Sequence, residues 1–228
     1  MMSGDSDHHP AALRNRQPIL DELLKLVDPS ASGAALEIAS GTGAHLEHFA
    51  PNFPSLQWQP SEYVEARVQT IGGVERAVDE RLLMIDAHGA KALKNVRPAV
   101  DLDVSLPFTS WPAVVQADAS KHALVYCSNM CHIAHWQCTL GLLAGAAAAL
   151  APGGKLIVYG PFKLDGAFIG DDGGAGNRQF DATLRQRNPE FGYRDTREVA
   201  TAAATVGLAL ASTTRMPANN LLLEFVRS

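Results

Sequence analysis

The feature that most constrains the fold is an apolar segment that runs directly into a turn with two glycines. Residues 34–39 (AALEIA) predict a short buried strand, residues 40–43 (SGTG) a tight turn, and residues 44–49 a helix. Gly41 and Gly43 carry no Cβ, so a ligand can approach the backbone, and the first N–H groups of the helix point toward it. This order of strand, turn and helix predicts a nucleotide-like ligand at the turn.

An acidic residue follows the next predicted strand at a matching distance. That strand covers residues 56–59, and Glu62 lies about 19 residues after Gly43. An acid roughly 20 residues beyond such a turn is placed to bind ribose hydroxyls. A lone Gly-x-Gly is usually only a turn, but the acid and the strand order together favour a nucleoside-containing cofactor.

Two cofactor classes share this turn and this acid, and two further residues separate them. Nicotinamide dinucleotides need Gly or Ala where this chain has Leu46, and Glu37 is unfavourable beside a pyrophosphate. S-adenosylmethionine carries an ammonium and a sulfonium but no phosphate, so a carboxylate at the end of the first strand favours it. The alternative for Glu37 is a buried strand acid that is paired inside the protein.

Apolar runs of strand length alternate with helical patterns along the rest of the chain, which is typical of an α/β fold with a mainly parallel sheet. The last two predicted strands are joined by a short linker, which favours an antiparallel hairpin. Further strands are expected at residues 100–104, 123–127, 156–159, 208–214 and 221–227; helices are expected at 18–27, across most of 64–95 with an interruption at Gly72-Gly73, and at 137–150 and 197–205.

Composition excludes several classes of function. The net charge is −5 without a Lys/Arg-rich run, so no nucleic-acid partner is expected. No apolar stretch approaches the roughly 20 residues of a membrane span, and residues 1–10 are polar, so neither a membrane nor a signal peptide is expected. All three cysteines lie between positions 127 and 138 and predict reduced thiols. We therefore expect one cytoplasmic domain over residues 1–228, with residues 1–10 flexible.

These residues resemble class I methyltransferases that use S-adenosylmethionine, whose first motif is acid-x-Gly-x-Gly-x-Gly. Residues 37–43 (EIASGTG) match it with Ala39 at the first glycine, and residues 102–104 (LDV) and 151–156 (APGGKL) continue the resemblance. It implies an α/β, Rossmann-like three-layer sandwich with a seven-stranded, mostly parallel sheet and an antiparallel C-terminal strand. The cofactor-binding residues that we assign in this part of the chain are Glu37, Ser40, Gly41, Gly43, Glu62 and, facing adenine, Asp103.

More narrowly, the chain is similar to the domain-of-unknown-function 938 family, which includes proteins called methyltransferase-like 26. The resemblance implies that Arg14 and Asn15 close over the cofactor, and it implies no settled substrate. The matching stretches are residues 14–20, 37–43, 59–62, 102–108, 129–136, 159–162 and 177–195.

The segment after the fourth strand is expected to flank the transferable methyl, because ligands bind at the carboxyl ends of strands in such sheets. Residues 127–136 (CSNMCHIAHW) bring amide, imidazole and indole groups into one short segment. We expect Asn129 and Met130 to contact the cofactor, and His135 and Trp136 to contact the acceptor.

Methyl transfer from a sulfonium is an in-line displacement, so alignment is the main task and base catalysis is optional. His132 is the preferred general base and Asp181 the weaker candidate; the alternative is that His132 braces its loop. The Cys and His residues of positions 127–138 also suggest a metal, but Cys-x-x-Cys pairs are absent, so no metal is expected.

Residues 163–195 predict a substrate lid whose hinge is the glycine-rich stretch 166–176. The alternative is a solvated helix with surface charges. The remaining residues that we expect to contact a small-molecule acceptor are Tyr159, Asn177, Arg187 and Arg194.

Three functions fit these observations to different degrees. A catalytic methyltransferase is favoured, because the cofactor motif is nearly intact and the acceptor segment is polar. A non-catalytic S-adenosylmethionine-binding partner subunit is the alternative. A nicotinamide-dependent oxidoreductase is disfavoured by Leu46 and by the terminal hairpin. The oligomeric state and the acceptor are left open.

Overall fold

The structure is a computed structural model that describes residues 8–64, 68–71, 74–77 and 80–228. The chain consists of two compact units, Met1–Asp103 and Val104–Ser228, called the N-terminal and the C-terminal unit below. None of the helices in the described ranges is long and apolar enough to span a membrane.

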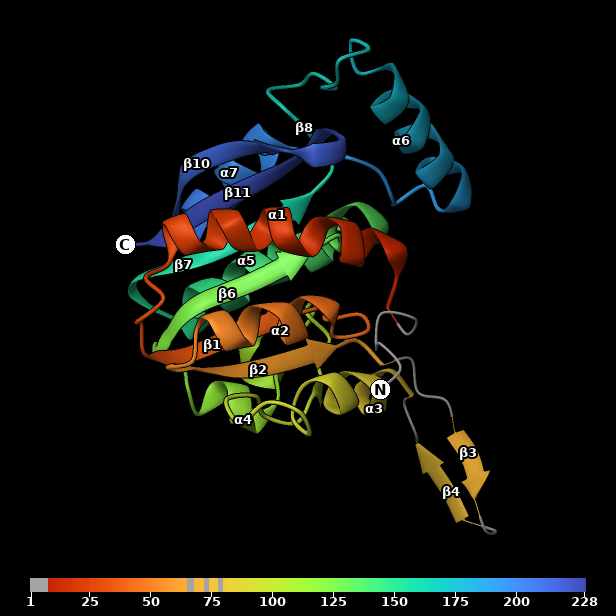
Figure 1. Ribbon diagram of the computed structural model, residues 1–228. Coiled ribbons are helices and arrows are strands. Elements are labelled where there is room, and N and C mark those ends of the chain that lie inside the picture. The colour runs from red at the N-terminus through yellow and green to blue at the C-terminus, as the bar shows by residue number, and fades with distance from the viewer. Residues whose placement is uncertain (1–7, 65–67, 72–73, 78–79) are drawn as a thin grey trace. The chain divides into compact units, whose positions relative to one another are not determined.

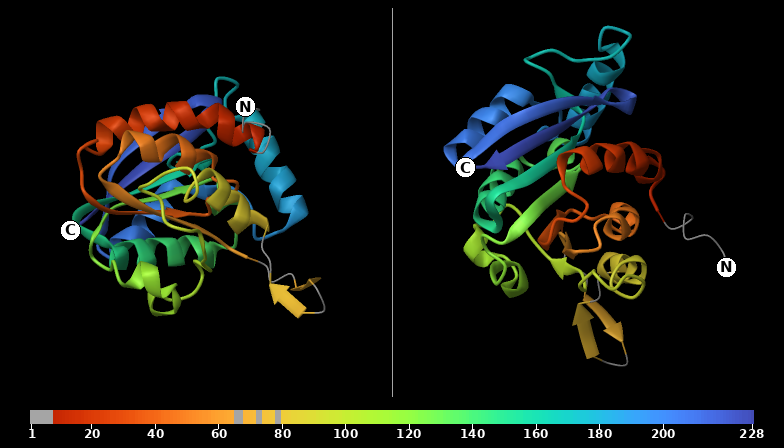
Figure 2. Two further views of the ribbon diagram at one scale, coloured as in Figure 1. Left: turned by 60° about the horizontal axis from the view of Figure 1, so that its bottom comes forward. Right: turned by 60° about the vertical axis from the view of Figure 1, so that its left-hand side comes forward.

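The N-terminal unit holds parallel strands in the order β1, β2, β5, and α2 packs against both α1 and α3 (Figures 1 and 2). The register pairs Glu37 with Pro60 and Glu62 with Asp101, so the acids of the cofactor motif reach the same edge. Its elements are α1 (Pro10–Leu26), β1 (Gly33–Ile38), α2 (Ala44–Phe49), β2 (Leu56–Glu62), β3 (Val68–Ile71), β4 (Val74–Ala77), α3 (Glu80–His88) and β5 (Val100–Asp101).

The first helix is longer than the sequence predicted. We expected it to begin at Pro18, but α1 begins at Pro10 and contains Pro18 in its interior. Pro10 occupies the first turn, where no N–H bond is needed, and the His9 side chain accepts a hydrogen bond from the Ala11 N–H. We expected residues 1–10 to be flexible, and residues 1–7 of this segment lie outside the described residues.

The prediction of a mostly helical segment over residues 64–95 is wrong in its first part. Strands β3 and β4 pair antiparallel, with Ile71 opposite Val74, and only α3 is helical in the second part. Val68, Thr70, Ile71 and Val74 are β-branched, and such residues favour strands. Two glycines between two such runs are a hairpin pattern in sequence; Gly72 and Gly73 themselves lie outside the described residues.

The C-terminal unit has strands in the order β10, β11, β7, β6, and β11 runs antiparallel to both of its neighbours, as the sequence predicted (Figure 2). Helix α7 packs against β10, and α6 follows the glycine-rich stretch, in the segment for which we predicted a lid or, as the alternative, a solvated helix. The elements are α4 (Ala113–Gln116), β6 (His122–Ser128), α5 (Trp136–Ala149), β7 (Leu150–Gly160), β8 (Phe162–Lys163), α6 (Ala175–Arg187), β9 (Arg194–Asp195), α7 (Thr196–Thr205), β10 (Leu208–Met216) and β11 (Asn220–Arg227).

Helix α5 depends on small residues for its close packing. Gly145 faces the buried Trp111 ring, and a Cβ at this position would clash with ring atoms. Gly141 likewise lies against the Val104 backbone. Glycine in a helix is unfavourable relative to alanine by about 1 kcal/mol, so close contact is the reason for both glycines.

We expect Gly145→Ala to destabilise the protein by roughly 1–3 kcal/mol, because overpacking against Trp111 outweighs the gain in helix propensity. Urea unfolding measures this. Gly176→Ala is the control, since a Cβ there meets only the end of the Asp172 side chain, and we expect it to be neutral or stabilising. A more stable Gly145→Ala protein would contradict the packing of Trp111 on α5.

Candidate functional site

The glycine turn has the backbone conformation that its sequence requires. Gly41 and Gly43 have φ of 60° and 81°, in the left-handed region that favours glycine. Ala39, which replaces the first glycine of the motif, also has a positive φ of 58°. Among the described residues, no heavy atom lies within 4 Å of the place that a Cβ on Gly41 would take, whereas one on Gly43 would lie 3.3 Å from the Ile85 Cα. Gly41 therefore faces open space, and Gly43 packs on α3.

Glu62 lies against this turn. The Gly41 N–H donates a hydrogen bond to Glu62 Oε2 at 2.7 Å, and the Tyr63 N–H donates to Oε1 at 3.1 Å. Arg81 Nη1 lies 3.8 Å from Oε1. The Ser40 N–H also donates to the Ser61 carbonyl at 2.9 Å, which joins the ends of β1 and β2. The structure thus brings together the turn and the acid that the spacing singled out; the role of Glu62 stays a prediction.

Glu37 is a buried acid at the end of β1, and it is only 1% exposed. Its Oε2 atom has no hydrogen-bond partner among the described residues. Burial raises the pKa of Glu37 to about 8; the nearby charge of Glu62 raises it further, and a hydrogen bond from Ser40 opposes both. Glu37 is therefore paired with Ser40 while its Oε2 is left without a partner among the described residues, and its role stays a prediction.

Asn15, Arg14 and Asp103 have different surroundings within the same unit. His45 Nε2 and Asn15 Oδ1 lie 2.7 Å apart. Burial lowers the pKa of His45 to about 3, so the ring is neutral and its N–H donates to Asn15. Arg14 is exposed on α1. Asp103 is half-buried just beyond β5, and the Leu102 N–H donates to the Glu62 carbonyl at 3.0 Å.

In the C-terminal unit, the segment after β6 turns sharply at Asn129, whose φ is 57°. Its N–H donates to the Tyr159 carbonyl at 2.8 Å, so the ends of β6 and β7 are held together. A Cβ on Gly160 would lie 3.7 Å from both Asn129 Oδ1 and His132 Nδ1. Met130 follows, with its sulfur 4.0 Å from Cys127 Sγ.

His132 is buried and has an unusually low pKa. Burial lowers this pKa to about 4, and the positive charge of Arg194 lowers it further, so the imidazole is neutral near pH 7. Its ring lies 6.1 Å from the ring of Phe180, which projects from α6. His132, which we predicted as the base, thus lies close to α6, which belongs to the segment that we predicted as a lid.

Arg194 is bonded to the loop that it faces. Its guanidinium donates to the carbonyls of Cys131 at 3.0 Å, Ala134 at 2.6 Å and Glu190 at 2.8 Å. It also lies over the ring of the half-buried Trp136, 5.7 Å from the centroid. These contacts give Arg194 a positioning role in the structure, and contact with an acceptor stays a prediction.

Asp181 fixes α6 to the following segment. Its carboxylate accepts a hydrogen bond from the Tyr193 N–H at 2.6 Å and one from Arg185 Nε at 2.9 Å. Asn177, also buried, donates to the Asn219 carbonyl at 3.2 Å, within the connection of β10 and β11. Both candidates therefore anchor the helix in this structure.

The other predicted acceptor residues differ in exposure. Tyr159 is buried, and its hydroxyl accepts a hydrogen bond from Asn220 at 3.0 Å. His135 is exposed and lies 2.8 Å from a carboxylate oxygen of Glu190. Arg187 is exposed in the last turn of α6.

Sequence reasoning missed an aromatic cluster beside His132. Phe180 and Tyr193 meet edge to face with ring centroids 6.1 Å apart, and Phe168 lies 5.5 Å from Tyr193. Phe180 is 42% exposed although it is large and apolar. The sequence signal that could have revealed this cluster is Phe180, an aromatic residue in an otherwise polar helix. Arg81 near Glu62 was also missed, because it follows a segment whose elements we had assigned wrongly.

A family model described as "Protein of unknown function (DUF938)" matches residues 6–227. The chain belongs to this family. Its predicted family resemblance is therefore confirmed.

Several solved structures with the same fold are described as methyltransferases. An O-methyltransferase family protein from Burkholderia thailandensis has a TM-score of 0.66 at 18% identity, covering 96% of this chain and 57% of that one. The pyocyanin biosynthetic protein PhzM has a TM-score of 0.65 at 15% identity, covering 92% and 54%. CalO1, a methyltransferase in calicheamicin biosynthesis solved in its SAH-bound form, has 0.61 at 13%, covering 94% and 54%.

This likeness confirms the predicted fold class, a Rossmann-like fold with a seven-stranded, mostly parallel sheet, antiparallel strands at the C-terminus and flanking helices. The chain spans a little over half the length of these three proteins. At such identities, the likeness shows the fold.

The raised pKa of Glu37 predicts a stability that falls as pH rises. An acid with a folded-state pKa of about 8 and an ordinary value of 4.5 stabilises the folded state fully below pH 4.5, and this contribution is lost as pH rises toward 8. We expect the free energy of unfolding of the wild type, relative to Glu37→Gln, to fall by roughly 4 kcal/mol between pH 5 and 8.5. Urea unfolding across this range measures it.

Glu198→Gln is the matched control, because Glu198 is exposed on α7. Its stability difference from the wild type should stay nearly constant over the same pH range. A constant difference for Glu37→Gln as well would mean that Glu37 is ionised in the folded protein throughout.

Proposed function

We propose that this protein binds S-adenosylmethionine at its glycine turn and transfers the methyl group to a small-molecule acceptor. The observation that carries the proposal is Glu37, a buried carboxyl whose Oε2 has no partner among the described residues. Buried carboxyls without partners are rare because burial of their charge is unfavourable, and a cationic ligand removes that penalty. Glu37 lies directly before the turn in which Gly41 faces open space.

The donors and acceptors around the turn fit this cofactor better than a dinucleotide. Glu37 and Glu62 flank the turn. The charge of Glu62 repels a pyrophosphate, and Glu37 can ionise beside a cation, so the two carboxyls suit a ligand whose charged groups are cationic. Glu62 suits ribose hydroxyls because its carboxylate is a hydrogen-bond acceptor on both oxygens. Asn15, Ser40 and Asp103 are the further residues of this unit that we assign to the cofactor.

The structural relatives support the same class of reaction. CalO1 was solved with SAH bound, which is the product that remains after S-adenosylmethionine gives up its methyl group. The Burkholderia protein is described as an O-methyltransferase family protein. We extend the cofactor and the reaction class from these relatives to this chain, and we leave the acceptor atom open.

When bound, S-adenosylmethionine supplies a methyl group that is activated by its positively charged sulfur. The protein's own task is to hold an acceptor in line and to exclude water. His132 is neutral near pH 7 because its pKa is about 4, so its ring has an unprotonated nitrogen, and we assign it as the proton acceptor for a hydroxyl or a protonated amine; the low pKa makes it a weak base. Phe180, beside His132, offers an exposed aromatic face for a flat or apolar acceptor.

Calorimetric titration of the purified protein tests the cofactor. We expect S-adenosylmethionine and SAH to bind and NADH not to bind, and Glu62→Ala to weaken the first two by roughly 10–100-fold through loss of charge-assisted hydrogen bonds. Binding at pH 7 should release close to one proton, because a cation favours the ionised form of Glu37, whose pKa is about 8 in the free protein. The released proton appears as a dependence of the binding enthalpy on the buffer.

Two control variants make the result specific. Glu198→Gln should bind as the wild type does, and Glu37→Gln should lose the proton release. Tight NADH binding without a response to S-adenosylmethionine would overturn the proposal in favour of an oxidoreductase. Binding of S-adenosylmethionine without turnover across an acceptor screen would instead favour a non-catalytic partner subunit.

Once an acceptor is known, His132→Asn tests the base. We expect kcat to fall by roughly 100- to 10,000-fold with little change in KM. The contribution of His132 to kcat should stay constant between about pH 6 and 8, because its pKa of about 4 lies below this range. His135→Asn, an exposed neighbour in the same segment, is the control. An unchanged kcat in His132→Asn would assign this residue to bracing its loop.

A further inference from the structure

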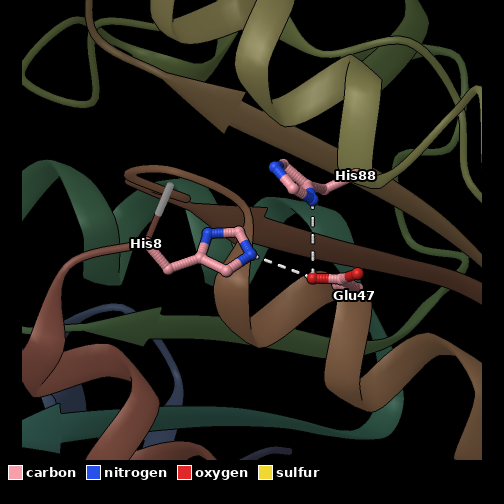
Figure 3. A group of neighbouring side chains, drawn as sticks. All are labelled: His8, Glu47 and His88. Carbon is pink, nitrogen blue, oxygen red and sulfur yellow. Dashed lines mark hydrogen bonds and ion pairs between the residues drawn. The ribbon is translucent and has the colours of Figure 1, made fainter. Parts of the chain in front are cut away.

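Three residues far apart in the sequence converge at one point of the N-terminal unit. His8 precedes α1, Glu47 lies on α2, and His88 is the last residue of α3. His8 Nε2 lies 2.9 Å and His88 Nδ1 lies 3.6 Å from the same carboxylate oxygen, Glu47 Oε2 (Figure 3). Within the described ranges, these three residues form a group whose ligand atoms all lie within 4.8 Å of one another.

The distances suit a shared metal ion. At zinc–ligand distances of about 2.0–2.1 Å, two ligand atoms of a tetrahedral site lie roughly 3.3 Å apart. The two measured separations from Glu47 Oε2, 2.9 and 3.6 Å, lie on either side of this value. The two imidazole rings are close, with centroids 4.3 Å apart, but tilted by 51°, so they are not stacked face to face.

The chemistry of the three groups also favours a metal over a hydrogen-bonded pair. Two imidazole nitrogens, one from His8 and one from His88, are directed at the same oxygen, Glu47 Oε2, as in a group of ligands around one ion (Figure 3). Two imidazoles and one carboxylate are a ligand set of zinc sites that keep a fourth position for water. Glu47, at 39% side-chain exposure, leaves a path to solvent, whereas the His8 side chain is fully buried.

His8 has the outer contact that metal-binding histidines usually have. Its Nδ1 lies 3.0 Å from Thr42 Oγ1. With Nε2 bound to a metal, Nδ1 carries the proton and donates it to Thr42, which fixes the tautomer and the orientation of the ring. Thr42 stands between the two glycines of the turn, so the group is adjacent to the candidate cofactor site.

We propose that His8, Glu47 and His88 bind one divalent transition-metal ion of the zinc class. The ion links His8, in the segment before α1, to Glu47 on α2 and His88 on α3, and so holds this segment against the two helices. The assignment does not depend on the proposed methyl transfer, because its ligands are distinct from Glu37 and Glu62.

The test is calorimetric titration of the full chain, freed of metal by a chelator, with zinc chloride alone. We expect one ion per chain, and we expect His8→Ala, His88→Ala and Glu47→Gln each to weaken binding at least about 100-fold. Thr42→Val should weaken it by about 10–100-fold, as is typical when an outer contact is lost. The matched control is His48→Ala, which removes a histidine beside Glu47 whose side chain bonds instead to Gln17.

A second measurement guards against variants that fail to fold. Thermal unfolding without metal should be similar in the wild type and in Glu47→Gln, and zinc should raise the unfolding temperature of the wild type and of His48→Ala only. Zinc binding by His8→Ala and His88→Ala with the affinity of the wild type would overturn the site. So would the absence of zinc binding by the wild type, in which case the group is a hydrogen-bonded ion pair.

Discussion

The hydrogen bond from the Gly41 N–H to the Glu62 carboxylate is the contact on which the geometry of the glycine turn depends. It ties the turn after β1 to the end of β2, and the bond from the Ser40 N–H to the Ser61 carbonyl runs alongside it. An L side chain at position 41 would disfavour the left-handed backbone that presents this N–H. The acid and the turn therefore depend on each other, and a ligand meets them as one preformed surface.

The C-terminal unit depends on a comparable constraint, which comes from ionic side chains bonded to backbone. Arg194 holds the carbonyls of Cys131 and Ala134, and Asp181 holds the Tyr193 N–H. These bonds fix the segment after β6 and helix α6 to the same short stretch of chain. Phe180 consequently reaches the buried ring of His132. The predicted lid is thus anchored through α6, and in the glycine-rich stretch before it Asp172 accepts hydrogen bonds from the N–H groups of Gly174 and Gly176.

The sequence predicted those elements whose structure depends on residues that are close together in the chain. The strand, turn and helix around Gly41, the spacing to Glu62 and the terminal hairpin were all evident, because each rests on residues near in sequence or on a fixed repeat. The start of α1 was missed because Pro18 also fits a first turn, and the β3–β4 pair because two glycines also interrupt helices. The contacts of Arg194 and the meeting of His8 with His88 were not predictable, since they join segments far apart in the chain.

Burial of Glu37 is the physical basis of the proposed preference for a cationic cofactor over a dinucleotide. A charged carboxylate at this depth is unfavourable, so the free protein keeps Glu37 protonated near neutral pH, with a pKa of about 8. A neutral acid neither attracts bulk cations nor destabilises the turn, but it ionises when a ligand brings a positive charge close to it. A pyrophosphate would hold the acid in its protonated form and gain nothing from it. In the proposed function, selectivity for the cofactor therefore arises from the depth of one side chain, and the glycines leave the room that either ligand needs.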